Sequence, residues 1–179
     1  MYPKLFQIGP LPVYSYGLML SIAFLVGNWL FGKELKRKGY DENTGFIITF
    51  LALIGGIVGA KLFYIIEDWN FGTGQALMTY FSKDILFSSS GLTFFGGLVL
   101  SILLIIIYCR AKKISVLETF DMMAPAAILG YGIARIGCHL AGDGDYGIII
   151  PEGSFWSFIG MGYPNGTVPT ARGVIVHPT

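Results

Sequence analysis

Charged residues are scarce in this sequence, because Asp, Glu, Lys and Arg together make up only 13% of its 179 positions. Hydrophobic residues make up 54%, and the mean hydropathy is +0.65. Soluble domains are rarely this apolar, so we interpret the chain as an integral membrane protein. The 12 basic residues are divided among short loops. Nucleic-acid binding needs a concentrated basic surface, so no nucleic-acid partner is expected.

Cysteine is scarce as well, and repeats and low-complexity tracts are absent. Cys109 and Cys138 lie on consecutive apolar runs that we place at opposite membrane faces, so no disulfide is expected between them. The segment from Cys138 to Asp145 matches no strong metal-binding signature. The sequence therefore predicts neither a metal nor another cofactor.

Four apolar runs approach the length of about 20 residues that a helix needs to cross the bilayer hydrocarbon. Lipid offers no partners for backbone polar groups, and the alternation of barrel strands is missing, so each run is predicted to be helical. The predicted fold class is therefore all-α, a polytopic helical membrane protein with four transmembrane helices. The runs comprise residues 13–31, 45–66, 91–109 and 119–138.

The predicted organisation is a transmembrane helical domain over residues 1–138, followed by an extracytoplasmic loop region over residues 139–179 that belongs to the same domain. Lys and Arg gather in the first and third loops between the runs, which makes these loops cytoplasmic. The N-terminus, residues 67–90 and everything after Cys138 are then outside. Residues 67–90 mix aromatic and polar side chains, which favours an interfacial helix.

The fourth run ends in a polar segment that begins with Arg135. A cation that cannot lose its charge costs about 2.5 to 3.5 kcal/mol in hydrocarbon on insertion scales, so it normally faces a partner, a wet cavity or an anionic ligand. The abundant anion at that depth is a phospholipid head group. Small residues also recur in the runs, at Gly59 and at Gly96-Gly97 for example. They indicate close helix packing or, for the diglycine, close approach of a lipid.

Four motifs occur in order along nearly the whole chain. They are residues 16–19 (YGLM), 59–64 (GAKLFY), 92–98 (LTFFGGL) and 134–147 (ARIGCHLAGDGDYG). Together they resemble the successive motifs of the prolipoprotein diacylglyceryl transferase family. Each motif alone is weak, whereas the ordered set, with RIG leading into a glycine-rich acidic loop, is fairly specific. His177-Pro178-Thr179 resembles the start of the family's HPxxxYE segment.

The resemblance implies a multi-pass enzyme of the bacterial inner (cytoplasmic) membrane with its active site on the periplasmic face. Such an enzyme moves the diacylglyceryl group of phosphatidylglycerol onto the lipobox cysteine thiol of a prolipoprotein signal peptide and leaves glycerol 1-phosphate. Its partners would be phosphatidylglycerol, these signal peptides and membrane lipids. A longer form of the chain would carry at least one more span with a further Arg. The chemistry needs a thiolate and stabilisation of the departing phosphate.

The resemblance also assigns residues to the lipid. A planar guanidinium can hold two phosphate oxygens at once, which suits Arg135. Tyr16 would contact the lipid head group, although tyrosines also anchor membrane interfaces. The loop backbone near Gly142 and Gly147 would complete the site. The predicted substrate-binding residues are Tyr16, Gly96, Gly97, Arg135, Gly142 and Gly147.

The base that activates the thiol is less clearly marked. A better-studied branch of the family has His before the diglycine, where this chain has Phe95, which cannot accept a proton. The alternatives are His139, Asp143 or Asp145 as base, or activation by the local positive field. His139 is also open to a metal-ligand or a structural interpretation, and Asp143 to a role in a turn. The predicted catalytic residues are Arg135, His139 and Asp143.

Two other functions stay open at this point. A catalytically silent, lipid-binding membrane homologue is favoured by Phe95. A small channel or transporter subunit would need polar residues at the middle of the membrane, where the runs offer almost none beyond Asn28 and Ser101.

Overall fold

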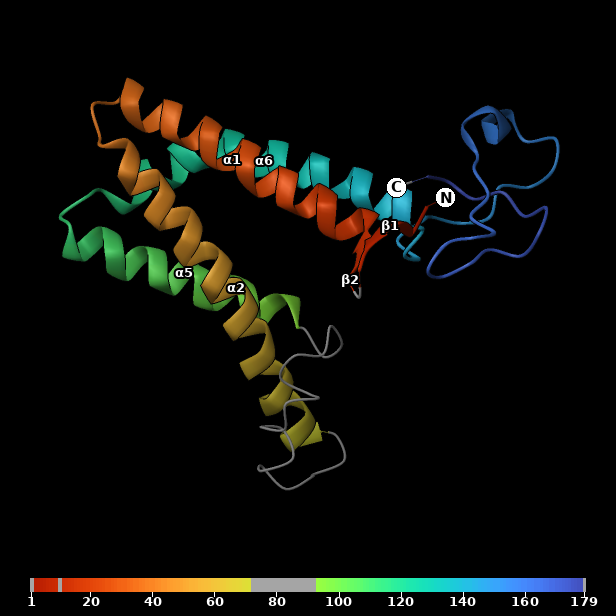
Figure 1. The fold of residues 1–179 in the computed structure, drawn as a ribbon, viewed down its shortest axis with the longest axis horizontal. Coiled ribbons are helices and arrows are strands. Elements are labelled where there is room, and N and C mark those ends of the chain that lie inside the picture. The colour runs from red at the N-terminus through yellow and green to blue at the C-terminus, as the bar shows by residue number, and fades with distance from the viewer. Residues whose placement is uncertain (1, 10, 72–92, 179) are drawn as a thin grey trace. The chain divides into compact units, whose positions relative to one another are not determined.

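Helices make up most of the computed structural model, which describes residues 2–9, 11–71 and 93–178 (Figure 1). The helices are α1 (Ser15–Arg37), α2 (Glu42–Phe71), α5 (Phe94–Ala111) and α6 (Val116–Ala141). Two strands, β1 (Lys4–Ile8) and β2 (Leu11–Tyr14), and a short 3-10 helix, η1 (Phe155–Ile159), complete the described elements. The predicted all-α helical class is confirmed. The predicted interfacial helix falls mostly outside the described residues, and residues 67–71 continue α2.

Within the described residues, three helices, α1, α2 and α5, are long and apolar enough to cross a membrane. The prediction of four such helices is therefore slightly too high, because α6 is not one of them. Its sequence includes Glu118, Asp121 and Arg135 as well as Pro125, whereas the central parts of α2 and α5 are almost entirely apolar. Charged residues and a proline thus lower the hydropathy of the helix that carries the predicted site.

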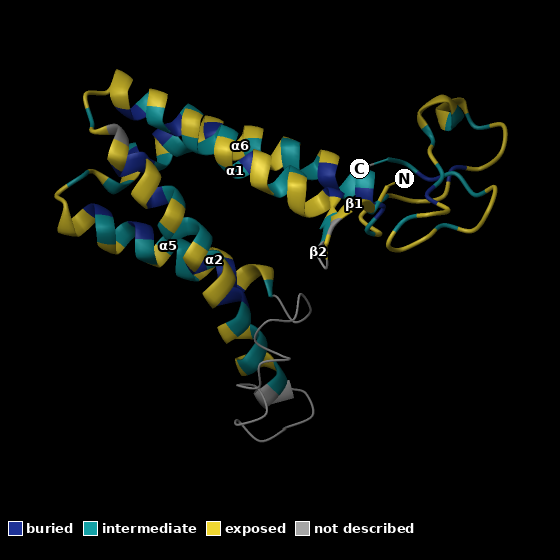
Figure 2. Cartoon of the chain, viewed as in Figure 1, coloured by how far each residue is buried: buried dark blue, intermediate teal, exposed yellow. Residues whose placement is uncertain are grey.

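Exposed residues occur along all the described helices (Figure 2), and many of them are large and apolar. Leu25 on α1 and Ile128 on α6 each expose 71% of their surface, and Ile107 on α5 exposes 60%. A soluble monomer rarely leaves this much apolar surface in water, whereas lipid solvates it well. Exposure of this kind is what a protein in a lipid bilayer requires.

The chain forms two compact units, one of residues 31–123 and the other of residues 1–30 with 124–179. In the first unit α2 and α5 pack through small residues. A Cβ added at Gly59 would lie 2.4 Å from the carbonyl oxygen of Gly96, and one added at Gly97 would lie 2.7 Å from that of Gly56. The hydroxyl of Ser101 donates to the carbonyl of Ala52 at 2.8 Å. The packing interpretation of these glycines is confirmed.

This contact predicts different outcomes for two alanine substitutions one helical turn apart. Gly59→Ala forces its Cβ into the backbone of Gly96, and overpacking of this kind costs about 1 to 3 kcal/mol. At Gly56 the nearest atom to an added Cβ is a Ser101 oxygen at 3.8 Å, so Gly56→Ala fits and gains up to about 1 kcal/mol of helix propensity. Thermal unfolding in detergent should show a lower midpoint for Gly59→Ala only. Equal midpoints would contradict the packing.

In the second unit, the first half of α1 runs antiparallel to the last half of α6. A Cβ at Gly137 would lie 2.9 Å from Cβ of Met19, and one at Gly130 would lie 3.6 Å from the carbonyl of Ala23. The hairpin of β1 and β2 precedes α1, and the Tyr2 N–H donates to the carbonyl of Leu140 at 3.1 Å. The start of α1 and the end of α6 therefore meet at one place.

Residues 142–178 form loops around a few extended contacts, as the glycines and prolines of this region predict. Ile149 and Met161 each form an antiparallel bridge with Val176. The side chains of Ile150, Tyr163 and Val176 are buried. These contacts fold the loop region back over the end of α6, where Val168 donates its N–H to the carbonyl of Gly142 at 2.8 Å.

Candidate active site

An open pocket of about 390 Å³ lies beside the last turns of α6. Gly132, Arg135, Ile136 and His139 line it from one face of the helix, because residues three and four apart point the same way. The loop region borders the pocket on another side; the residues it contributes are Met161 and Pro178. The structure thus brings together two of the three predicted catalytic residues, Arg135 and His139.

Arg135 interacts with an acidic and an aromatic side chain of its own unit. It forms an ion pair with Asp145, and its guanidinium carbon lies 5.7 Å from the centre of the Tyr131 ring. The Arg135 side chain is still 31% exposed, and that of Asp145 is 54% exposed. The cation therefore has a counterion but is not enclosed by acids, and it lines the pocket where a second anion can reach it.

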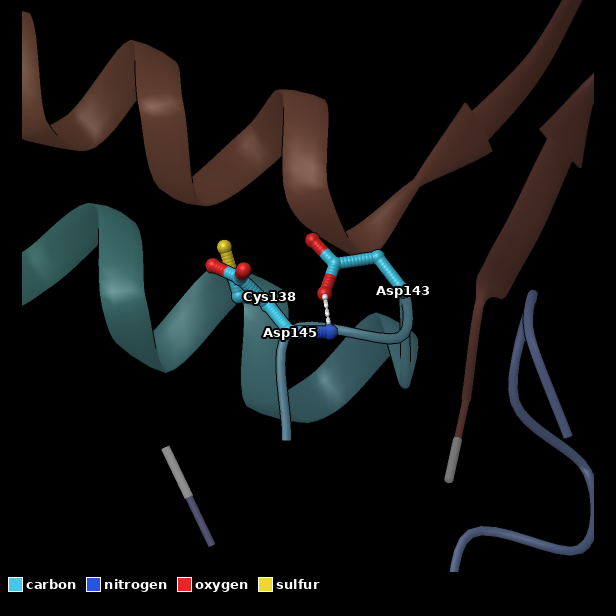
Figure 3. A group of neighbouring side chains, drawn as sticks. All are labelled: Cys138, Asp143 and Asp145. Carbon is cyan, nitrogen blue, oxygen red and sulfur yellow. Dashed lines mark hydrogen bonds between the residues drawn. The ribbon is translucent and has the colours of Figure 1, made fainter. Parts of the chain in front are cut away.

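The acidic residues after α6 form a turn (Figure 3). Oδ1 of Asp143 accepts a hydrogen bond from the N–H of Asp145 at 3.3 Å, and Gly144 has a φ of +92°. The turn interpretation of Asp143 is confirmed. Sγ of Cys138 and carboxylate oxygens of Asp143 and Asp145 lie within 4.8 Å of one another. The turn and the Arg135 ion pair explain why these carboxylates gather here.

His139 is held by a tyrosine from the loop region. Its Nδ1 lies 2.9 Å from the hydroxyl oxygen of Tyr163, and the two rings are nearly perpendicular, at 88°. Tyr163 is only 1% exposed, and the Tyr146 ring stacks on it at 5.1 Å. This contact supports the structural interpretation of His139, and His139 also lines the pocket. Sequence reasoning missed this role of Tyr163, which lies 24 residues along the chain.

The predicted glycines Gly142 and Gly147 form hydrogen bonds with the backbone of the chain itself. Gly142 ends α6 with a φ of +60°, and its N–H donates to the carbonyl of Cys138 at 2.8 Å. The N–H of Gly147 donates to the carbonyl of His177 at 2.9 Å. Tyr16 lies at the start of α1, where Cα of Tyr16 is 3.5 Å from a Cβ added at Gly137.

The other two predicted substrate-binding residues belong to the other compact unit. Gly96 and Gly97 are buried against α2 and pack on its backbone. Helix packing thus accounts for the absence of a side chain at both positions. Lipid binding by these glycines, by Tyr16, and by the backbone near Gly142 and Gly147 stays a prediction.

Comparison with known proteins identifies the sequence family. Residues 3–179 match the model of a family described as prolipoprotein diacylglyceryl transferase. The chain is similar to proteins named phosphatidylglycerol–prolipoprotein diacylglyceryl transferase. The relative from Clostridium tetani is 34% identical over 79% of this chain and 55% of its own length, and the relative from Leptospira interrogans is 30% identical over 74% and 47%. A relative from Clostridium perfringens, whose name ends in 2, is 33% identical over 83% and 59%. The chain spans about half the length of these relatives.

Proposed function

The chain belongs to the prolipoprotein diacylglyceryl transferase family, and on that premise we propose that it transfers the diacylglyceryl group of phosphatidylglycerol to the lipobox cysteine of prolipoprotein signal peptides. The names of its relatives support both substrates, phosphatidylglycerol and prolipoprotein. The observation that carries the proposal is Arg135, a partly exposed cation in an open pocket beside the last turns of α6.

The reaction forms a carbon–sulfur bond and breaks a carbon–oxygen bond. The thiolate of the lipobox cysteine attacks the methylene carbon that joins the diacylglycerol to the phosphate. The electrons of the broken bond go to the phosphate oxygen, and glycerol 1-phosphate leaves. The thiol proton goes to a base, for which His139 lines the same pocket as Arg135. Asp143 is the less suited base, because its Oδ1 accepts the hydrogen bond that forms the turn.

Arg135 stabilises the charge on the departing phosphate. Its guanidinium offers five N–H donors, more than one carboxylate can use, so a phosphate can join or replace Asp145. A cation that is already fixed in place stabilises developing charge without reorganisation during the reaction. Residues 139–179 would form the extracytoplasmic loop region, with the N-terminus and the pocket on the periplasmic face of the inner membrane.

A transfer assay tests this function directly. The longest natural form of the chain is incubated in nanodiscs that contain phosphatidylglycerol, with a signal peptide that carries a lipobox cysteine. Mass spectrometry should detect the peptide with one added diacylglyceryl group and an equal amount of glycerol 1-phosphate. A peptide with serine at the lipobox position is the control and should stay unmodified. Binding of phosphatidylglycerol without any transfer would instead identify a catalytically silent homologue.

A further inference from the structure

We propose that Tyr163 is a positioning residue for His139. The Tyr163 hydroxyl accepts a hydrogen bond from Nδ1–H of His139, and this leaves the lone pair of Nε2 to take the thiol proton. The proposal rests on the proposed function, since it concerns the base of that reaction. It starts from the 2.9 Å contact between Nδ1 of His139 and the Tyr163 hydroxyl. Because Nδ1 is turned toward this hydroxyl, Nε2 is the ring nitrogen that remains for a substrate in the pocket.

Tyr163 is held firmly enough to fix a partner. Its N–H donates to Oγ1 of Thr170 at 2.9 Å, and its carbonyl accepts from the N–H groups of Gly166 and Thr170, each at 3.1 Å. The ring is stacked with Tyr146 at an interplanar angle of 19°. Gly142 also packs against the ring, since a Cβ added at Gly142 would lie 3.2 Å from Cδ1 of Tyr163. The hydroxyl therefore has a set position relative to the end of α6.

The direction of the hydrogen bond follows from what a base must do. Neutral imidazole carries one N–H, and only the tautomer with the proton on Nδ1 leaves Nε2 able to accept. In that tautomer the tyrosine oxygen is the acceptor, and the bond stays unchanged when Nε2 takes a proton, because both nitrogens then donate. If the hydroxyl donated to Nδ1, Nε2 would already carry the proton. A buried hydroxyl that accepts this hydrogen bond can keep it in both the neutral and the protonated state of His139.

Nitrogen NMR of the ring tests the tautomer without any need for activity. The chain holds only two histidines, so in a sample labelled with ¹⁵N-histidine the substitution His177→Gln assigns the signals of His139. At a pH where the ring is neutral, the wild type should show a protonated Nδ1 and an unprotonated Nε2. Tyr163→Phe should move the proton toward Nε2, the tautomer that an isolated histidine side chain prefers in water. Tyr146→Phe, which loses only a bond to the Val168 carbonyl, should not.

Kinetics in the transfer assay test the positioning role. Tyr163→Phe should lower kcat by about 10-fold to 100-fold and leave KM for phosphatidylglycerol within about twofold, since general-base catalysis contributes about 100-fold to 10,000-fold. In a His139→Gln background the same substitution should have no further effect, because the two residues act as a unit. Tyr146→Phe is again the control.

Several results would overturn the proposal. These are a wild-type ring protonated on Nε2, an unchanged tautomer in Tyr163→Phe, or full activity of His139→Gln. A failure of the proposed function is recognised separately, because the wild type would then transfer nothing. The nitrogen spectra would in that case decide alone whether Tyr163 sets the tautomer of His139.

Discussion

Replacement of Arg135 by alanine is expected to slow diacylglyceryl transfer by about 100-fold to 1000-fold. Loss of one donor to a developing oxyanion typically costs this much. Alanine removes all the N–H donors that Arg135 offers to the phosphate. Arg135→Lys should recover only part of the rate, because a lysine keeps the charge but not the planar donor fork. The measurement is the rate of thioether formation in the assay with phosphatidylglycerol and the lipobox peptide.

The Arg135 result depends on the fold staying intact, and the structure predicts that it does. The Asp145 carboxylate that loses its partner is 54% exposed, so water can solvate it. Exposed ion pairs contribute about 0 to 1 kcal/mol to stability. The thermal midpoint of Arg135→Ala should therefore stay near that of the wild type. Arg172→Ala changes another exposed arginine of the same unit, outside the pocket, and should leave the rate unchanged. Full activity of Arg135→Ala would refute the phosphate role.

The helices were predictable because lipid imposes two simple requirements. A segment must be long enough to cross the hydrocarbon, and its backbone N–H and C=O groups must be hydrogen-bonded within the segment. The four apolar runs each correspond to one helix, and the helices are generally longer than the runs because polar residues at their ends extend them. α6 shows the limit of this reasoning, since the charged residues that mark a functional helix also lower its hydropathy. The sequence does not predict the hairpin of β1 and β2, although Gly9-Pro10 is a turn signal, because strands of five and four residues are too short to show a clear periodic pattern.

The site was predictable only in the part that one helix supplies. Arg135 and His139 are four residues apart, so a helix places them on one face. The sequence predicts Asp145 as a possible base or turn residue but not as the partner of Arg135, because the position of a residue beyond the end of α6 depends on the path of the turn. Tyr163 depends on loop contacts with Thr170 and Gly166 that no periodicity encodes. The position of a side chain on a loop can be known only from the tertiary structure. The face on which a helical side chain lies follows from its spacing in the sequence.

Gly142→Ala is expected to lower stability more than any other glycine substitution in the loop region with the same backbone conformation. Gly142 has a φ of +60°, and an added Cβ would lie 2.8 Å from Cα of Gly166 and 3.2 Å from the Tyr163 ring. The left-handed conformation costs about 1 to 2 kcal/mol for alanine, and the clash adds about 1 to 3 kcal/mol. Thermal unfolding in detergent measures the sum.

Gly153→Ala separates the two contributions to the Gly142 effect. Gly153 has a φ of +76°, but an added Cβ would meet nothing within 4 Å, so this variant carries the conformational cost alone. The difference between the two midpoints then measures how tightly the loop region packs on the end of α6. Because the clash pushes on the ring that holds His139, Gly142→Ala should also lower the transfer rate, and Gly153→Ala should not. Equal losses of stability in the two variants would mean that the loop region yields at Gly166 and does not hold Tyr163 in place.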